Sequence, residues 1–260
     1  MSPAASLTPS TLAETDMTKY SISNLRLHWT AKVREFEREY EVCIELFREI
    51  AEVGSLVVEA LAQHRNLEAN CAFLLVTKAL NHSFSTMLLI ERGLIVDAAL
   101  TSRNAIETLL LLELLAKRPV LCQKWAGGHE FKPADVRRQL SELPRVVVQN
   151  LAIEVSPDEY DDVRFAYSWL SRITHANLES LHHSASEEID ASTENSYALH
   201  IGGAHSPTAA AAITAALGSA FDRAMLTAIV THAQDKLEPN LDAFKRLEHR
   251  LSVIIGKKST

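Results

Sequence analysis

Residues 94–117 of the chain read LIVDAALTSRNAIETLLLLELLAK, and this stretch decides the fold. A helix built from it is apolar around most of its circumference, which is typical of a helix that packs against neighbours on several sides. We therefore expect a helix over residues 94–117 at the centre of an all-α protein.

The segments before this stretch have the same helical character. Only eight glycines and eight prolines interrupt the 260 residues, of which 47% are hydrophobic and 23% charged. Apolar residues recur at three- and four-residue steps from about Asn24 to Leu61, which predicts a long amphipathic helix. A break near Arg65 and Asn66 precedes a second helix, which we expect to end at Gly93.

The segments after it carry clear helix start signals. Ser156-Pro157 and Ser206-Pro207 each place a capping serine before a proline at the first helical position. Residues 181–205 are the least regular part, and a short extended piece around 197–201 is compatible with the fold class. The predicted fold is an all-α, up-and-down bundle of about seven helices. The later helices are expected over about 119–125, 133–143, 157–180, 207–234 and 240–254.

The chain ends and the cysteines suggest a single intracellular domain. We expect a disordered leader over residues 1–19, one helical domain over 20–255 and a polar tail over 256–260. No signal peptide and no charge-free apolar run of about 18 residues is present, so we predict a cytoplasmic protein without a membrane span. Cys43, Cys71 and Cys122 lie in apolar helical stretches and are expected to be buried and reduced.

The net charge of −7 does not favour general nucleic-acid binding. One local group of basic residues, Lys132, Arg137, Arg138 and Arg145, lies within and beside a predicted helix. We interpret this group as the solvated face of an amphipathic helix. A nucleic-acid contact through it is the alternative.

The first polar group of interest is Arg103 with Glu107, within the central apolar helix. Residues four apart lie on one face of a helix and can form an ion pair. Asp97, Thr101, Asn104 and Thr108 recur beside them at helical spacing and are expected to mark the least buried side of that helix. The pair is either a structural ion pair or part of a functional site.

The second polar group is a stripe on the predicted helix over 157–180. Arg164, Ser168, Ser171 and His175 follow one another at three- and four-residue steps and share one side of the helix. His175 can act as a general acid or base, and Arg172 can bind a phosphate or carboxylate. The structural interpretation is that His175 interacts with the helix dipole near the C-terminal end.

Signatures of cofactor or metal chemistry are missing from the sequence. No phosphate-binding glycine loop, dinucleotide fingerprint or nucleophile elbow occurs. The histidines at 182, 183, 200 and 205 have no helical i,i+4 spacing and no cysteine partner. We therefore expect neither a metal site nor a cofactor.

Three segments resemble a widespread bacterial all-helical family of uncharacterised proteins. They are LIERGLIVDAALTSRNAIETLLLL, KWAGGHEFKPADVRRQL and YSWLSRITHANLES, and the likeness spans about Cys71 to Ser180. The resemblance implies that Arg103, Glu107, Ser171 and His175 occupy the recurrent polar positions of the family. It implies no activity.

A fainter likeness is to the helical nucleotide-binding and ribonuclease domains of prokaryotic toxin and defence systems. Their pattern is an Arg, a polar residue, three further residues and a His. Arg103-Asn104 begins this pattern, but Thr108 stands where the His belongs.

Two functions follow from these observations. The first is a non-enzymatic helical module that binds a small anionic ligand or a protein partner, expected to be a homodimer. The alternative is a metal-independent ribonuclease or phosphodiesterase of a toxin or phage-defence system, which would use His175 with Arg103, Glu107 or Arg172.

Overall fold

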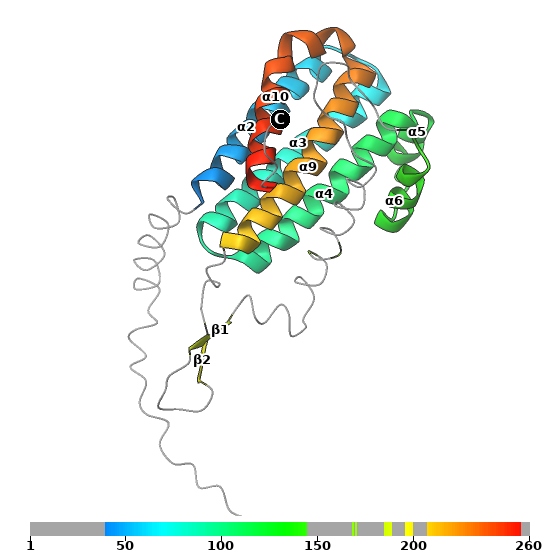
Figure 1. Ribbon diagram of the computed structural model, residues 1–260. Helices are drawn as coiled ribbons and strands as arrows, with labels where there is room; N and C mark the ends of the chain where they lie inside the picture. The colour runs from blue at the N-terminus through cyan, green and yellow to red at the C-terminus, as the bar shows by residue number, and fades with distance from the viewer. Residues whose placement is uncertain are drawn as a thin grey trace, which may run out of the picture.

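The computed structural model describes residues 40–144, 168, 170, 185–188, 196–199 and 207–255. The protein is an all-α, multi-helix bundle, as the sequence predicts (Figure 1). Seven α-helices and one 3-10 helix lie in the described ranges. They are α2 (Glu41–Ala62), α3 (Leu67–Glu91), α4 (Ile95–Lys117), α5 (Val120–Ala126), α6 (Pro133–Ser141), α9 (Pro207–His232), η2 (Gln234–Lys236) and α10 (Leu237–Ile255).

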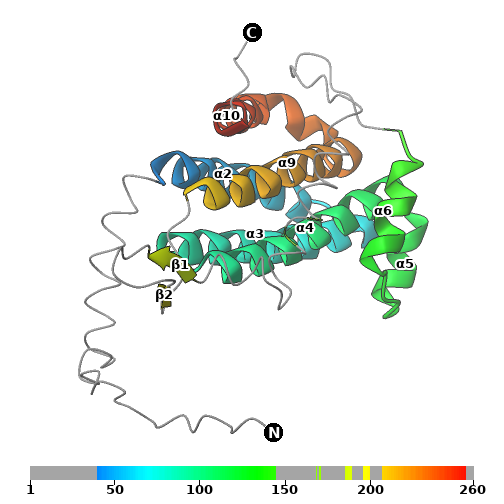
Figure 2. The same cartoon turned by 60° about the horizontal axis from the view of Figure 1, so that its bottom comes forward.

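The long helices form three layers, which Figure 2 shows from the side. Helix α10 lies over α2 and α9, and those two helices lie over α3 and α4. The most extensive helix contact joins α3 to α4, which run in opposite directions, and α4 also packs broadly against α9. The α3–α4 layer therefore has an inner face against α2 and α9, and an outer face.

The predicted helix boundaries at Asn66 and Gly93 are confirmed, while the predicted start of the first helix near Asn24 lies outside the described residues. Asn66 caps α3 because its Oδ1 accepts a hydrogen bond of 2.7 Å from the backbone N–H of Ala69. Gly93 ends the α3–α4 turn with φ of 71°, a left-handed conformation that favours glycine. The short turn forces α3 and α4 to pack side by side.

Two features of the second half differ from the predictions. Residues 185–188 (β1) and 196–199 (β2) pair as an antiparallel two-stranded ribbon, where only one short extended piece near residue 197 was expected. Helix α10 begins at Leu237 and not at Asn240. Pro239 therefore lies in its first turn, where a missing backbone N–H breaks no helical hydrogen bond.

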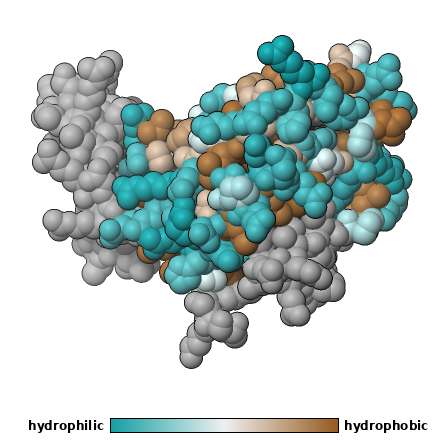
Figure 3. Space-filling model, turned by 90° about the horizontal axis from the view of Figure 1, so that it is seen from above, coloured by the Kyte–Doolittle hydropathy of each residue, from teal (hydrophilic) through white to brown (hydrophobic). Residues whose placement is uncertain are grey.

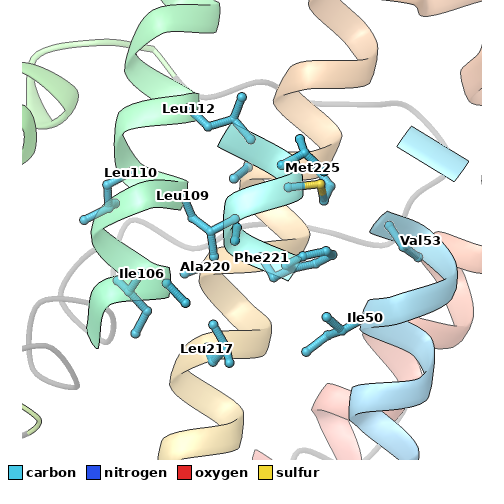
Figure 4. Close-up of a cluster of buried hydrophobic side chains, with 14 of the residues drawn as sticks. Ile50, Val53, Ile106, Leu109, Leu110, Leu112, Leu217, Ala220, Phe221 and Met225 are labelled. Atoms are coloured by element: carbon cyan, nitrogen blue, oxygen red, sulfur yellow. The ribbon is translucent and has the colours of Figure 1, made fainter. Parts of the chain in front are cut away.

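The hydrophobic core takes residues from α2, α3, α4, α9 and α10, and Figure 4 shows its part between α2, α4 and α9. Ile106 and Leu109 of α4 pack with Phe221 of α9 and Ile50 of α2, all fully or almost fully buried. Helix α4 is not the sole centre, because α9 contacts α2, α3, α4 and α10. Gly218 permits this closeness, since a Cβ there would lie 2.6 Å from Leu251 Cδ2 and 2.9 Å from Leu46 Cδ2.

In the part of the chain that the structure describes, two helices are long and apolar enough to cross a membrane by length and composition alone. They are α9, whose apolar window is 78% buried, and α3, whose window is 39% buried. The core helix of a soluble protein passes the same test, and the burial of α9 fits that explanation. The face seen in Figure 3 is mostly hydrophilic, with apolar side chains scattered across it.

Candidate functional site

The central helix α4 carries the predicted Arg103–Glu107 pair. Arg103 Nε donates a hydrogen bond of 3.1 Å to Glu107 Oε1 across one helical turn. The two side chains are 25% and 24% exposed, so the pair is neither sealed in the core nor free on the surface. The prediction that these residues pair is confirmed.

The side of α4 that bears this pair is less exposed to solvent than the sequence predicts. Asp97 and Asn104 are exposed as expected, but Thr108 is buried. Thr108 satisfies its hydroxyl locally, by donating a hydrogen bond of 2.9 Å to the carbonyl of Asn104. A threonine that bonds back to its own helix can be buried without a polar partner on another element, which is why its polarity misled the prediction.

The same helix holds a second charged group that sequence reasoning missed. Glu113 is fully buried, and Lys117 Nζ donates to its Oε1 at 2.6 Å. Arg223, on α9, donates from Nε to the other carboxylate oxygen at 2.7 Å. Lys117 and Arg223 are themselves largely buried. The group joins α4 to α9 in the interior of the bundle.

The surroundings of Glu113 keep it ionised. Burial alone would raise the pKa of this carboxyl, but the nearby charges of Arg223 and Lys117, and the hydrogen bonds that they donate, lower it below its usual range. Both carboxylate oxygens are occupied by cations within the bundle, so this group is structural.

The sequence spacing predicts only one of the two ion pairs in this triad of Glu113, Lys117 and Arg223. Glu113 and Lys117 have the i,i+4 spacing of a helical ion pair. Arg223 is 110 residues away from Glu113, and only the packing of α9 on α4 brings the two together.

Most of the second predicted polar group lies outside the described residues. This holds for Arg164, Ser171, Arg172 and His175, so their distances to Arg103 and Glu107 stay untested. Ser168 is helical and exposed. Leu170, two residues later, is helical and fully buried in the hydrophobic core.

Of the described basic residues within and beside helix α6, two are exposed and one is half-buried. Arg138 lies 3.3 Å from Asp135, and both side chains are well exposed. Lys132 is exposed at the start of the helix, and Arg137 is half-buried. Arg145 lies outside the described residues. Part of the positive charge is thus compensated within the helix, as in the solvated face that we favoured.

The three cysteines are free and buried, as predicted. Cys71 of α3 and Cys122 of α5 are in side-chain contact. Burial, together with the neighbouring Cys71, raises the pKa of Cys122 to about 12. A thiol with such a pKa is not a nucleophile at neutral pH, so the pair contributes packing between α3 and α5.

Among the described residues, no group of three or more His, Cys, Asp or Glu side chains is placed to hold a metal ion. The histidines at 182, 183, 200 and 205 lie outside those residues. No family model matches the chain, and comparisons with curated proteins and with solved structures give no match either. The resemblances seen in the sequence therefore stay predictions.

Proposed function

We propose that this chain is a non-enzymatic helical module that binds a protein partner through the outer face of its α3–α4 layer. The proposal rests on the exposed apolar residues that lie beside the Arg103–Glu107 pair. Beside this half-buried pair on α4 is the exposed Leu100. The neighbouring helix α3 exposes Leu74 and Leu88.

A face of this composition suits a protein better than a small anion. Glu107 compensates the charge of Arg103, so the pair offers no net positive field to an anionic ligand. Exposed leucines beside a paired arginine are typical of a protein interface, where arginine and large apolar side chains are enriched and unpaired charges are depleted.

The comparison with Glu113 supports a role beyond stability for the outer pair. A charged group that only braces the bundle can be sealed between helices, as the Glu113 triad is. The ion pair between Arg103 and Glu107 lies within α4, and about a quarter of each side chain is exposed.

The experiment is photo-crosslinking in cells that express the full chain. The photoreactive residue p-benzoylphenylalanine replaces Leu74 or Leu100 on the proposed face, or Val120 on α5 as the matched control. Val120 is even more exposed, at 76%. We expect covalent adducts with one discrete protein from the Leu74 and Leu100 positions and not from Val120. Adducts of equal yield at all three positions, or no protein adduct at Leu74 and Leu100, would overturn the proposal.

The alternative activity is tested directly with the purified chain. It is incubated with RNA and with bis(p-nitrophenyl) phosphate in the presence of a chelator, beside the Glu107→Gln and His175→Ala variants. We expect no turnover above the buffer rate. Turnover that both substitutions abolish, while the melting temperature is kept, would establish a metal-independent phosphodiesterase and overturn the non-enzymatic assignment.

A small anion is the remaining alternative. Thermal melting is followed while inorganic phosphate is titrated against the wild type and the Arg103→Met variant, with ionic strength held constant. We expect equal melting shifts in both proteins. A shift that needs Arg103 would place an anion site at the pair and contradict the preference for a protein partner.

A further inference from the structure

Helix α3 has apolar residues on two opposite faces. Its inner face is buried at three- and four-residue steps, for example at Ala72, Val76 and Ala79. Its outward face is exposed at eight positions, of which four are large apolar residues and only one is charged. The eight are Leu67, Asn70, Leu74, Lys78, Asn81, Phe84, Ser85 and Leu88.

This outward face departs from the usual pattern of a bundle helix. The solvent side of such a helix normally carries charged and polar residues. Here Leu67, Leu74, Phe84 and Leu88 are between 41% and 58% exposed. The first two and the last recur at intervals of seven residues, with Asn81 completing the series, so they form one stripe along the helix. Large apolar side chains that gather on one exposed helix face in this way mark an interaction surface.

We propose, resting on the proposed function above, that the partner is a second copy of this chain. In this dimer the α3 helices of the two copies pack antiparallel across a two-fold axis near Asn81. The axis places Leu74 against Leu88 of the partner subunit, because both residues are seven positions from Asn81. A two-fold axis lets one patch serve both sides of an interface.

The charge distribution favours a copy of the chain over a charged partner. The whole chain has a net charge of −7. The outward face of α3 carries one exposed charge, Lys78, and the adjoining face of α4 carries Asp97 and the compensated Arg103–Glu107 pair. This face is thus close to neutral and meets its own copy without the repulsion that the rest of the surface would cause.

The position of Lys78 selects the antiparallel arrangement. In a parallel pairing, Lys78 would lie beside Lys78 of the partner subunit. An antiparallel pairing about Asn81 instead places Lys78 beside Ser85 of the partner subunit. The two residues are seven apart and so share one side of the helix, and they lie three residues before and four residues after Asn81. Asn81 meets its own copy at the axis, where two carboxamides can donate and accept a hydrogen bond reciprocally.

The available area fits a stable dimer. A helix of the 25 residues of α3 is about 37 Å long. Helices α3 and α4 side by side, with axes roughly 9 Å apart, present a face on the order of 700 Å². Standard interfaces cover about 600–1,000 Å² per partner. The outer face of the α3–α4 layer, including Leu100 of α4, is therefore large enough.

The first test measures the mass of the purified full chain by analytical ultracentrifugation from 1 to 100 µM. We expect a species of twice the 28.8 kDa chain mass. The double variant Leu74→Glu/Leu88→Glu should be monomeric across the range, because each interface would bury four uncompensated carboxylates. Val120→Glu, the control on α5, should remain dimeric. All three proteins should keep the same helical circular dichroism, since the altered residues are exposed, and only the monomeric variant should lose the concentration dependence of its melting temperature.

A monomeric wild type at 100 µM would overturn the dimer. So would a dimer that Leu74→Glu/Leu88→Glu leaves intact. If this variant also unfolds, the milder Leu74→Gln/Leu88→Gln variant decides in the same way, because it weakens the apolar contact without adding charge.

The second test fixes the orientation by disulfide trapping under mild oxidation. In the antiparallel dimer, a mixture of the Leu74→Cys and Leu88→Cys variants forms a covalent dimer, and neither variant does so alone. Asn81→Cys, on the axis, cross-links with itself and serves as the positive control. The native cysteines are buried and do not interfere. Cross-linking of Leu74→Cys with itself would overturn the antiparallel arrangement.

Photo-crosslinking at Leu74 separates this inference from the proposed function. An adduct with a second copy of the chain supports both. An adduct with a different protein, from a chain that is monomeric when purified, overturns the homodimer and keeps the protein-binding function. An adduct within the same chain, to any of residues 145–206, overturns both.

Discussion

Glu107 and Glu113 are six residues apart on the same helix, and each pairs with a cation one helical turn away. The Glu107 carboxylate pairs with Arg103, and about a quarter of each side chain is exposed. The Glu113 carboxylate is sealed between α4 and α9 with Lys117 and Arg223. The comparison teaches that i,i+4 spacing predicts a pair but not its environment, and the environment decides what the pair contributes.

The largest expected effect is the loss of the buried carboxylate. Glu113→Ala removes the buried carboxylate that Lys117 and Arg223 both contact, and breaking a buried pair in this way costs about 3–5 kcal/mol. Urea denaturation followed by circular dichroism measures the free energy of unfolding. A loss below about 1 kcal/mol would mean that water reaches the triad, and the contrast with Glu107 would disappear.

The second prediction concerns how the stability of the fold depends on pH. Because the pKa of Glu113 is lowered in the folded protein, this group stabilises the fold at pH values above the unfolded pKa of about 4.3. The stabilisation is lost as the pH falls through the lower, folded pKa. Glu113→Gln removes this contribution at every pH.

The wild type should therefore lose its stability advantage over Glu113→Gln as the pH falls below about 4.3. Urea midpoints of both proteins between pH 2.5 and 7 give the difference, in which the other carboxylates cancel. A constant difference across this range would contradict the lowered pKa.

The Arg103–Glu107 pair should give a smaller effect on stability. Glu107→Ala is expected to change the free energy of unfolding by less than about 1 kcal/mol, because the pair is partly solvated and lies within one helix. The same urea titration measures it, with Arg103→Ala as the matched variant. A loss as large as that of Glu113→Ala would show that the Arg103–Glu107 pair stabilises the fold. This result would count against its proposed role in an interface.

The fold was predictable from the sequence because it rests on local signals. The Asn66 cap, Gly93 and the proline at 207 each act within one helical turn, and the structure has helix boundaries at all three. The start of α10 is three residues earlier than predicted, and Pro239 lies in its first turn, where proline is tolerated.

The candidate site was only partly predictable, because burial depends on tertiary contacts. The Arg103–Glu107 pair was foreseen from its spacing, whereas Arg223 reaches Glu113 from a helix 110 residues away. The outward stripe of α3 was missed for a related reason. Its leucines are as apolar as those of the core, and sequence periodicity alone does not separate the two faces of a helix that is apolar on both.

The smallest expected effect comes from Ser102, which precedes Arg103 and faces the interior. Its side chain is fully buried, and its Oγ has no hydrogen-bond partner among the described residues. A buried hydroxyl without a partner loses its hydration and gains no bond in return. Ser102→Ala should therefore leave stability unchanged or raise it by up to about 1 kcal/mol, as measured by urea denaturation.

Thr214→Ala is the matched control, since the buried Thr214 hydroxyl donates a hydrogen bond of 2.7 Å to the carbonyl of Ala210. This replacement should destabilise the fold. If Ser102→Ala were the more destabilising of the two, Ser102 would have to bond a group outside the described residues. The polar site on α4 would then extend inward from the Arg103–Glu107 pair.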